Sequence, residues 1–186
     1  MNAIKKKKEA TAAPAYLFMF CLFLVLAIIV VYLLDMARFM TMQHHIDDAL
    51  ADAVLASMVV DEHYYFETQE SERTPVIRFN DKQESYNIYK ECLADSIAET
   101  PDFYHNFEYD QFILYELEDG DINVTTYLND GTYTTNTQSL GGVTTPGGEN
   151  VTKTSVYGKV AFDIQSNLVT IPQHKSREIY CVFNLN

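Results

Sequence analysis

One uninterrupted apolar segment near the N-terminus dominates the pattern of hydrophobic and polar positions in this chain. It comprises the 19 residues from Tyr16 to Leu34, none of which is charged. A helix of that length spans about 28 Å, close to the roughly 30 Å hydrocarbon core of a bilayer. Tyr16 and Tyr32 fall near its two ends, where amphipathic rings prefer the headgroup level. The pattern therefore predicts a transmembrane helix.

The charges on either side of this segment predict its orientation. Four consecutive lysines, residues 5–8, precede it, whereas Asp35 and Arg38 are the first charges after it. Because lysine and arginine are enriched on the cytoplasmic side, we expect a cytoplasmic N-terminus and an extracytoplasmic C-terminal part. A removable signal peptide would have a shorter apolar core, about 7–15 residues, and a cleavage site with small residues. Neither is present, which favours an uncleaved signal anchor.

The helical pattern continues beyond the apolar segment. No glycine or proline occurs from Met36 to Val60. Apolar and small residues recur there at spacings of three and four, which is typical of one helix face; they are Ile46, Ala49, Leu50, Ala53, Val54 and Ser57. We therefore predict one continuous helix from about Tyr16 to about Val59, about 65 Å long.

This stripe has two interpretations that the sequence leaves open. It packs either on the chain's own globular part or on neighbouring subunits. Small residues at Ala49, Ala53 and Ala56 allow a partner helix to approach closely. We accordingly predict a helix-packing and assembly surface made of Ile46, Ala49, Leu50, Ala53 and Ala56.

A polar connector and a second helix follow. Residues 67–75 are polar and end in a proline, which predicts a loop. The next segment, 82–99, has an apolar face formed by Tyr86, Tyr89, Leu93 and Ile97. Asp81 is the predicted N-cap, and Glu84 three residues later completes a capping-box pattern.

After this helix the pattern changes to the alternation typical of strands. We predict strands at 111–117, 122–128, 132–137, 151–165 and 178–185, with a hairpin turn at 129–131 and a mobile Gly/Pro loop at 141–150. Val156, Val160, Phe162 and Ile164 share one face of the fourth segment, and Ile179, Cys181, Phe183 and Leu185 share one face of the last. The expected fold class is α+β: a four- or five-stranded antiparallel meander with one face on helices and the other in solvent.

These elements divide the chain into four parts. We expect a basic cytoplasmic tail at 1–15, the transmembrane helix at 16–34, a helical extension at 35–60, and an extracytoplasmic α+β head at 61–186. The tail carries about three net positive charges, whereas the rest of the chain carries about sixteen net negative charges within a total of −13. An acidic exported part excludes nucleic acid as a partner, because phosphate contacts need a basic surface.

The three cysteines fall in different parts of the chain. Cys21 lies in the apolar segment, where it serves as a small apolar residue. Cys92 and Cys181 lie in the exported part. They either form a disulfide in an oxidising exterior or remain two free thiols, because sequence does not supply the Cα separation that a disulfide requires.

Catalytic signatures are absent from the sequence. His44 and Asp48 share a helix face and are candidate metal ligands, but a site needs three or four ligands. Glu116, Glu118, Asp119 and Asp121 resemble a calcium loop only loosely, and a solvated hairpin turn explains them better. We therefore expect no enzymatic activity, no metal or other cofactor and no small-molecule substrate.

The N-terminal region resembles a known family. The segment KKKKEATAAPAYLFMFCLFLVLAIIVVYLLDMARFMTMQHHIDDALADAVLASM is similar to TadE/TadG-like proteins of tight-adherence (Flp-type) pilus systems, in the form found in Gram-positive bacteria. In that family an apolar span is followed by a position such as Arg38 and an alanine-rich helix. Cleavage after Ala15 would place Phe20 where processed pilins carry Glu, which favours a minor or assembly-associated subunit.

The resemblance implies a structural, non-enzymatic role. The expected partners are the lipid bilayer and other pilin-like subunits or membrane proteins of an assembly platform. The alternative is a membrane-tethered binding module whose head recognises a ligand or an envelope partner through its hairpin loops. The two hypotheses differ in whether the helix or the head carries the interaction.

Overall fold

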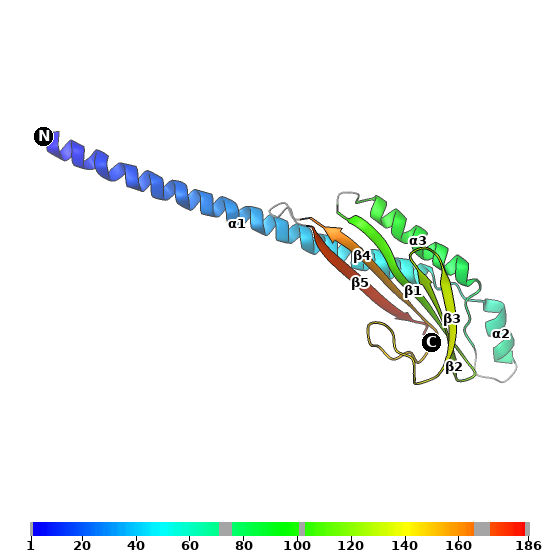
Figure 1. Ribbon diagram of the computed structural model, residues 1–186. Helices are drawn as coiled ribbons and strands as arrows, with labels where there is room; N and C mark the ends of the chain where they lie inside the picture. Colours follow the sequence, from blue (N-terminus) through cyan, green and yellow to red (C-terminus); the bar gives the residue numbers. More distant parts are fainter. Residues whose placement is uncertain (1, 71–75, 101–102, 166–171, 185–186) are drawn as a thin grey trace.

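The computed structural model describes residues 2–70, 76–100, 103–165 and 172–184, with side chains from residue 14 onward. A single long helix, α1 (Asn2–Ala56), projects from a head made of helices and a sheet (Figure 1). The head contains α2 (Glu62–Glu70) and α3 (Lys82–Ala98), followed by five strands. The α+β fold class is confirmed, and so is the continuous helix that runs from the apolar segment into the head.

Helix α1 ends where its backbone turns towards the sheet. Its last turn is closed by a hydrogen bond from the Ser57 amide to the Ala53 carbonyl, 3.1 Å long. The Ser57 hydroxyl, which is buried, donates to the carbonyl of Val54 at 2.7 Å. The chain then forms a single antiparallel bridge between Val60 and Phe79, which leads it into the head.

The predicted loop at 67–75 is wrong for its first four residues, which belong to α2. Asp61 begins this helix: its carboxylate accepts a hydrogen bond from the Tyr64 amide at 3.0 Å, and its carbonyl accepts one from the Tyr65 amide. The polar sequence hid the helix because α2 has no buried residue and therefore no apolar stripe. The rest of the predicted loop, residues 71–75, lies outside the described residues.

The predicted N-cap of the next helix is confirmed. Asp81 is extended, and its carboxylate accepts hydrogen bonds from the amides of Gln83 and Glu84 at the start of α3. These bonds satisfy two of the amide groups that a helix N-terminus leaves unpaired. The buried face of α3 contains Tyr86, Tyr89 and Leu93 of the four predicted residues.

The sheet has five antiparallel strands in the order β3-β2-β1-β4-β5. They are β1 (His105–Glu118), β2 (Asp121–Leu128), β3 (Tyr133–Ser139), β4 (Ser155–Ile164) and β5 (Gln173–Val182). Several predicted boundaries are wrong: β1 starts six residues before residue 111, β4 starts four residues after residue 151, and β5 starts five residues before residue 178 and ends at Val182. Leu185 lies outside the described residues.

Helices α1 and α3 cover one face of the sheet and enclose the main core (Figure 1). Aromatic rings stack between helix and sheet: Tyr89 on Phe112 and Tyr86 on Tyr127, both with centroids 4.5 Å apart. Gly158 lies beneath both helices. A Cβ atom at this position would be 2.7 Å from a methyl carbon of Val54 and 3.1 Å from the Tyr89 ring. The absence of a side chain there lets the helices approach the sheet.

The sequence predicted that the opposite face of the sheet is exposed to solvent, and this is wrong for part of that face. A second cluster of buried side chains covers part of it, comprising Ile113, Tyr115, Ile122, Val143, Val151 and Tyr157. Two of these come from the Gly/Pro segment predicted to be a mobile loop: Val143 lies within it and Val151 directly follows it. That segment is folded back on itself by a bridge between Thr144 and Asn150 and a 3.0 Å hydrogen bond from the Val151 amide to the Val143 carbonyl.

The helical extension at 35–60 and the head at 61–186 are not separate structural units. Met42, Ile46, Leu50 and Val54 of α1 are buried in the same core as α3 and the sheet. The predicted boundary at residue 61 therefore cuts through the head, because the outer part of α1 supplies much of the cover on one face of the sheet.

Candidate interaction surfaces

The first surface is the part of α1 that projects from the head. Its large apolar side chains from Tyr16 to Leu34 are all exposed. Among the described residues, α1 is the one helix long and apolar enough to cross a membrane, and none of its most apolar window is buried. This segment, which we call the free half of α1, is a candidate membrane span.

The predicted assembly stripe lies elsewhere. Ile46, Ala49, Leu50 and Ala53 are buried beneath the chain's own head, where α1 packs against α3, β4 and β5. Of the five predicted residues, Ala56 alone is exposed. The first four are therefore helix-packing residues within the subunit and offer no surface to a neighbour. Small residues permit close approach in either setting, so their spacing did not distinguish the two interpretations.

The opposite side of the same helix is polar. His44, Asp48 and Asp52 are exposed at intervals of four residues, and Leu55 lies near the end of this row. The described residues contain no group of three or more metal-ligating side chains, at His44 and Asp48 or elsewhere. A neighbouring copy would meet this row with like charges, which disfavours contact between two such faces.

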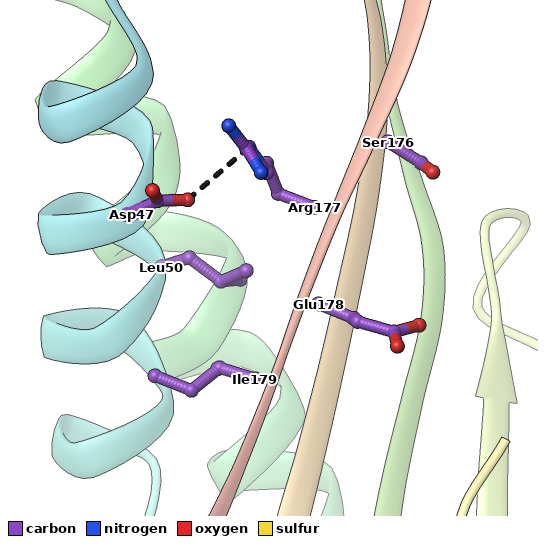
Figure 2. Close-up of a pocket in the computed structure, with 6 residues that line it drawn as sticks. All are labelled: Asp47, Leu50, Ser176, Arg177, Glu178 and Ile179. Carbon is purple, nitrogen blue, oxygen red and sulfur yellow. Dashed lines mark ion pairs between the residues drawn. The ribbon is translucent and has the colours of Figure 1, made fainter. Parts of the chain in front are cut away.

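A groove runs between α1 and the edge strand β5 (Figure 2). It has a volume of about 590 Å³ and is lined by Asp47, Leu50, Ser176, Arg177, Glu178 and Ile179. Arg177 and Ile179 point towards α1, whereas Ser176 and Glu178 point to the other side of the strand (Figure 2). The groove therefore has an apolar part at Leu50 and Ile179 and a charged part at Asp47 and Arg177.

The charges of this groove neutralise each other. Arg177 Nε lies 3.3 Å from Asp47 Oδ1, and both side chains are partly exposed. Across the strand, Glu178 accepts a hydrogen bond of 2.6 Å from the Tyr157 hydroxyl. Burial, reinforced by this hydrogen bond and the Glu178 charge, raises the pKa of Tyr157. The groove joins elements of the fold and offers no nucleophile with an adjacent base.

Two of the four carboxylates considered as a calcium loop, Glu116 and Glu118, form ion pairs with basic side chains of the chain. Glu116 is buried, pairs with Lys82, and accepts a 3.0 Å hydrogen bond from the Phe79 amide. Glu118 pairs with Arg78, whose guanidinium lies 4.1 Å from the centroid of the Tyr64 ring. The two ion pairs connect residues 34 and 40 positions apart, so local sequence gave no signal of them.

The cysteines are free in the structure. Cys21 is exposed on the free half of α1, and Cys92 and Cys181 are partly buried beside the main core. Of the two alternatives for Cys92 and Cys181, the structure therefore contains two thiols and no disulfide. Burial raises the pKa of both thiols, which keeps them in the less reactive protonated form.

No family model, curated protein or solved structure matches this chain.

Proposed function

We propose that this protein is a non-enzymatic, pilin-like structural or assembly subunit of a surface pilus or secretion apparatus. In this proposal the free half of α1 spans the bilayer, the lysine-rich N-terminus is cytoplasmic, and the head is extracytoplasmic. The partners are other pilin-like subunits or membrane proteins of an assembly platform. The role resembles that of TadE/TadG-like proteins.

The observation that supports the proposal is that one helix contains both the candidate membrane span and part of the core of the head. The same α1 provides an exposed apolar rod and, without a break, a core element of the head. A simple tether needs no such continuity, because a flexible linker would serve equally well. A rigid connection suits a subunit whose head must be held in a fixed relation to helices packed in the membrane.

The burial of the predicted stripe favours a different assembly surface in this proposal. Since the stripe around Ala53 is buried, lateral contacts fall to the free half of α1. Lipid tails are as apolar as the helix, so packing shape rather than hydrophobicity would select its partners there.

A replacement of the span tests this proposal. Residues 16–34 are exchanged for nineteen leucines, which retains a membrane span but removes its surface shape. Subunits are then crosslinked in membranes of the source cell, and the adducts are identified by mass spectrometry. We expect the native chain to crosslink to other proteins with a span followed by an exported head, and the polyleucine chain to lose these adducts.

The complementary outcome supports the binding-module alternative. If the polyleucine chain keeps its partners, the head carries the interaction and the pilin-like proposal is refuted. Equal protease resistance of the two heads is the control for folding. A fragment of residues 61–186 would not serve for this purpose, because it lacks the part of the core that Ile46, Leu50 and Val54 provide.

A further inference from the structure

We infer that the head rests directly on the bilayer, with the pair formed by Arg38 and Phe103 lying in the phospholipid headgroup layer. This inference depends on the proposed membrane span. It concerns where the head sits and which molecules its membrane-proximal end contacts.

The burial pattern along α1 leaves no stalk between span and head. Leu34, the last residue of the apolar segment, is 66% exposed, whereas the next residue, Asp35, is only 6% exposed. Arg38 and Phe39 are half-buried, and Met42 is fully buried. The head therefore begins to enclose α1 within one helical turn of the end of the apolar segment.

The distance from Leu34 to Arg38 along α1 determines which layer of the bilayer the head contacts. Arg38 follows Leu34 by four residues, a rise of about 6 Å. The headgroup region is about 5–7 Å thick on each side of the hydrocarbon core. A tilted helix would shorten the vertical distance and bring Arg38 closer to the core. If Leu34 marks the edge of the core, Arg38 lies at the level of the phosphates.

The chemistry of this end suits phospholipid headgroups. The Arg38 guanidinium lies 5.7 Å from the centroid of the Phe103 ring, on the segment that leads into β1. The positive charge of a guanidinium is favourable beside phosphate groups, and an aromatic ring packs well beside the upper acyl chains. Met36 and Met40, on the same stretch of α1, are exposed and apolar.

Phe103 is also held rigidly against α1. The hydroxyl of its neighbour Tyr104 donates a 2.8 Å hydrogen bond to the Met42 carbonyl. The same oxygen lies 3.0 Å from His45 Nδ1, which must donate because the tyrosine proton is already used. The position of Phe103 relative to the span is thus defined by the fold.

The acidity of the head does not oppose this arrangement. Asp47 and Asp48 lie 13 and 14 residues beyond Leu34, about 20 Å along the helix. From the level of Arg38 the separation is still about 14 Å, which exceeds the Debye length of about 8 Å at physiological ionic strength, so the phosphates would experience these charges only weakly. Asp35, which is nearer, is buried.

The chain contains no tryptophan, so a single introduced tryptophan reports on one position. Full-length Phe103→Trp and Met40→Trp variants are reconstituted in phosphatidylcholine vesicles that carry quenchers either on the headgroup or deep in the acyl chains. Phe66→Trp is the matched control, because Phe66 lies on α2 and is 57% exposed. Leu24→Trp reports on the span.

We expect headgroup quenchers to reduce the fluorescence at positions 103 and 40 at least twofold more than at position 66. Deep quenchers should act on position 24. If position 24 is quenched while 103 and 40 behave like 66, the head stands away from the membrane and the inference is wrong. If position 24 is not quenched, the proposed span itself fails. Use of two membrane-proximal positions guards against a folding defect in either variant.

Discussion

Replacing Gly158 by alanine should destabilise the head through a steric conflict with both covering helices. The added Cβ atom would be 2.7 Å from Val54 Cγ2 and 3.1 Å from Tyr89 Cε2, so these buried side chains or the elements that carry them must move. Overpacking of this kind costs about 1–3 kcal/mol. The lower backbone entropy of alanine in the unfolded chain returns about 0.4–1 kcal/mol. The midpoints of these two ranges give a net loss of about 1.3 kcal/mol.

Denaturant unfolding of the full-length protein in detergent micelles, followed by near-ultraviolet circular dichroism of the tyrosines, measures this loss. Gly142→Ala is the matched control, because a Cβ at Gly142 would make only an ordinary 3.5 Å contact with the Ser139 carbonyl oxygen. That variant should change stability by less than about 0.5 kcal/mol.

A double variant identifies the cause. Val54→Ala removes the methyl group that the new Cβ would meet. Alone it destabilises by deleting buried apolar volume, but combined with Gly158→Ala its cost should be at least about 0.5 kcal/mol less than additive. Additive effects, or a Gly158→Ala variant as stable as the native chain, would refute the proposed steric conflict.

The same unfolding assay tests three further expectations. Ala53→Leu should cost about 1–3 kcal/mol because Ala53 is fully buried, whereas Ala56→Leu on the surface should be nearly neutral. Tyr89→Phe should not destabilise and should add up to about 1 kcal/mol, since its buried hydroxyl has no hydrogen-bond partner among the described residues. Tyr104→Phe removes two hydrogen bonds and should destabilise. Burial raises the pKa of Tyr104 to about 12, so the folded state keeps a proton that the unfolded chain releases near pH 10. Stability should therefore fall between about pH 10 and 12, less steeply in Tyr104→Phe; opposite signs would refute each statement.

Sequence periodicity predicted the elements whose buried faces have a regular spacing. The α1 stripe, the buried face of α3 and the alternation in β4 all appear in the main core. The N-cap at Asp81 could also be predicted from sequence, because its hydrogen bonds connect residues only two and three positions apart. Local patterns succeed where the interactions that stabilise an element are themselves local or where one face is buried.

Elements stabilised by distant contacts escaped prediction. Helix α2 has no buried side chain, and the first half of β5, from Gln173 to Arg177, is polar. Strand β5 forms there because its backbone pairs with β4, which needs no apolar side chain. The Gly/Pro segment covers the sheet through two isolated valines, a number too small to create a period.

Prediction of the candidate surfaces from sequence was limited in the same way, because their contacts are made by residues far apart in the chain. Sequence located the apolar segment and the helix-packing residues but not the partner of that packing, since a stripe at helical spacing fits a sheet and a neighbouring helix equally well. The ion pairs at Glu116 and Glu118 required the folded arrangement, because their cations lie far away in the chain.

The contact between α1 and β5 has a consequence for the order of folding. Asp47 and Arg177 meet across the groove although 130 positions separate them. The first helix to be synthesised is thus completed by the last strand, and such non-local closure is slow. During synthesis of the chain, the buried stripe of α1 stays uncovered until residues 173–182 arrive. Pairing of β5 with β4 and its packing on α1 therefore complete the fold, and loss of β5 would leave the core open on one side.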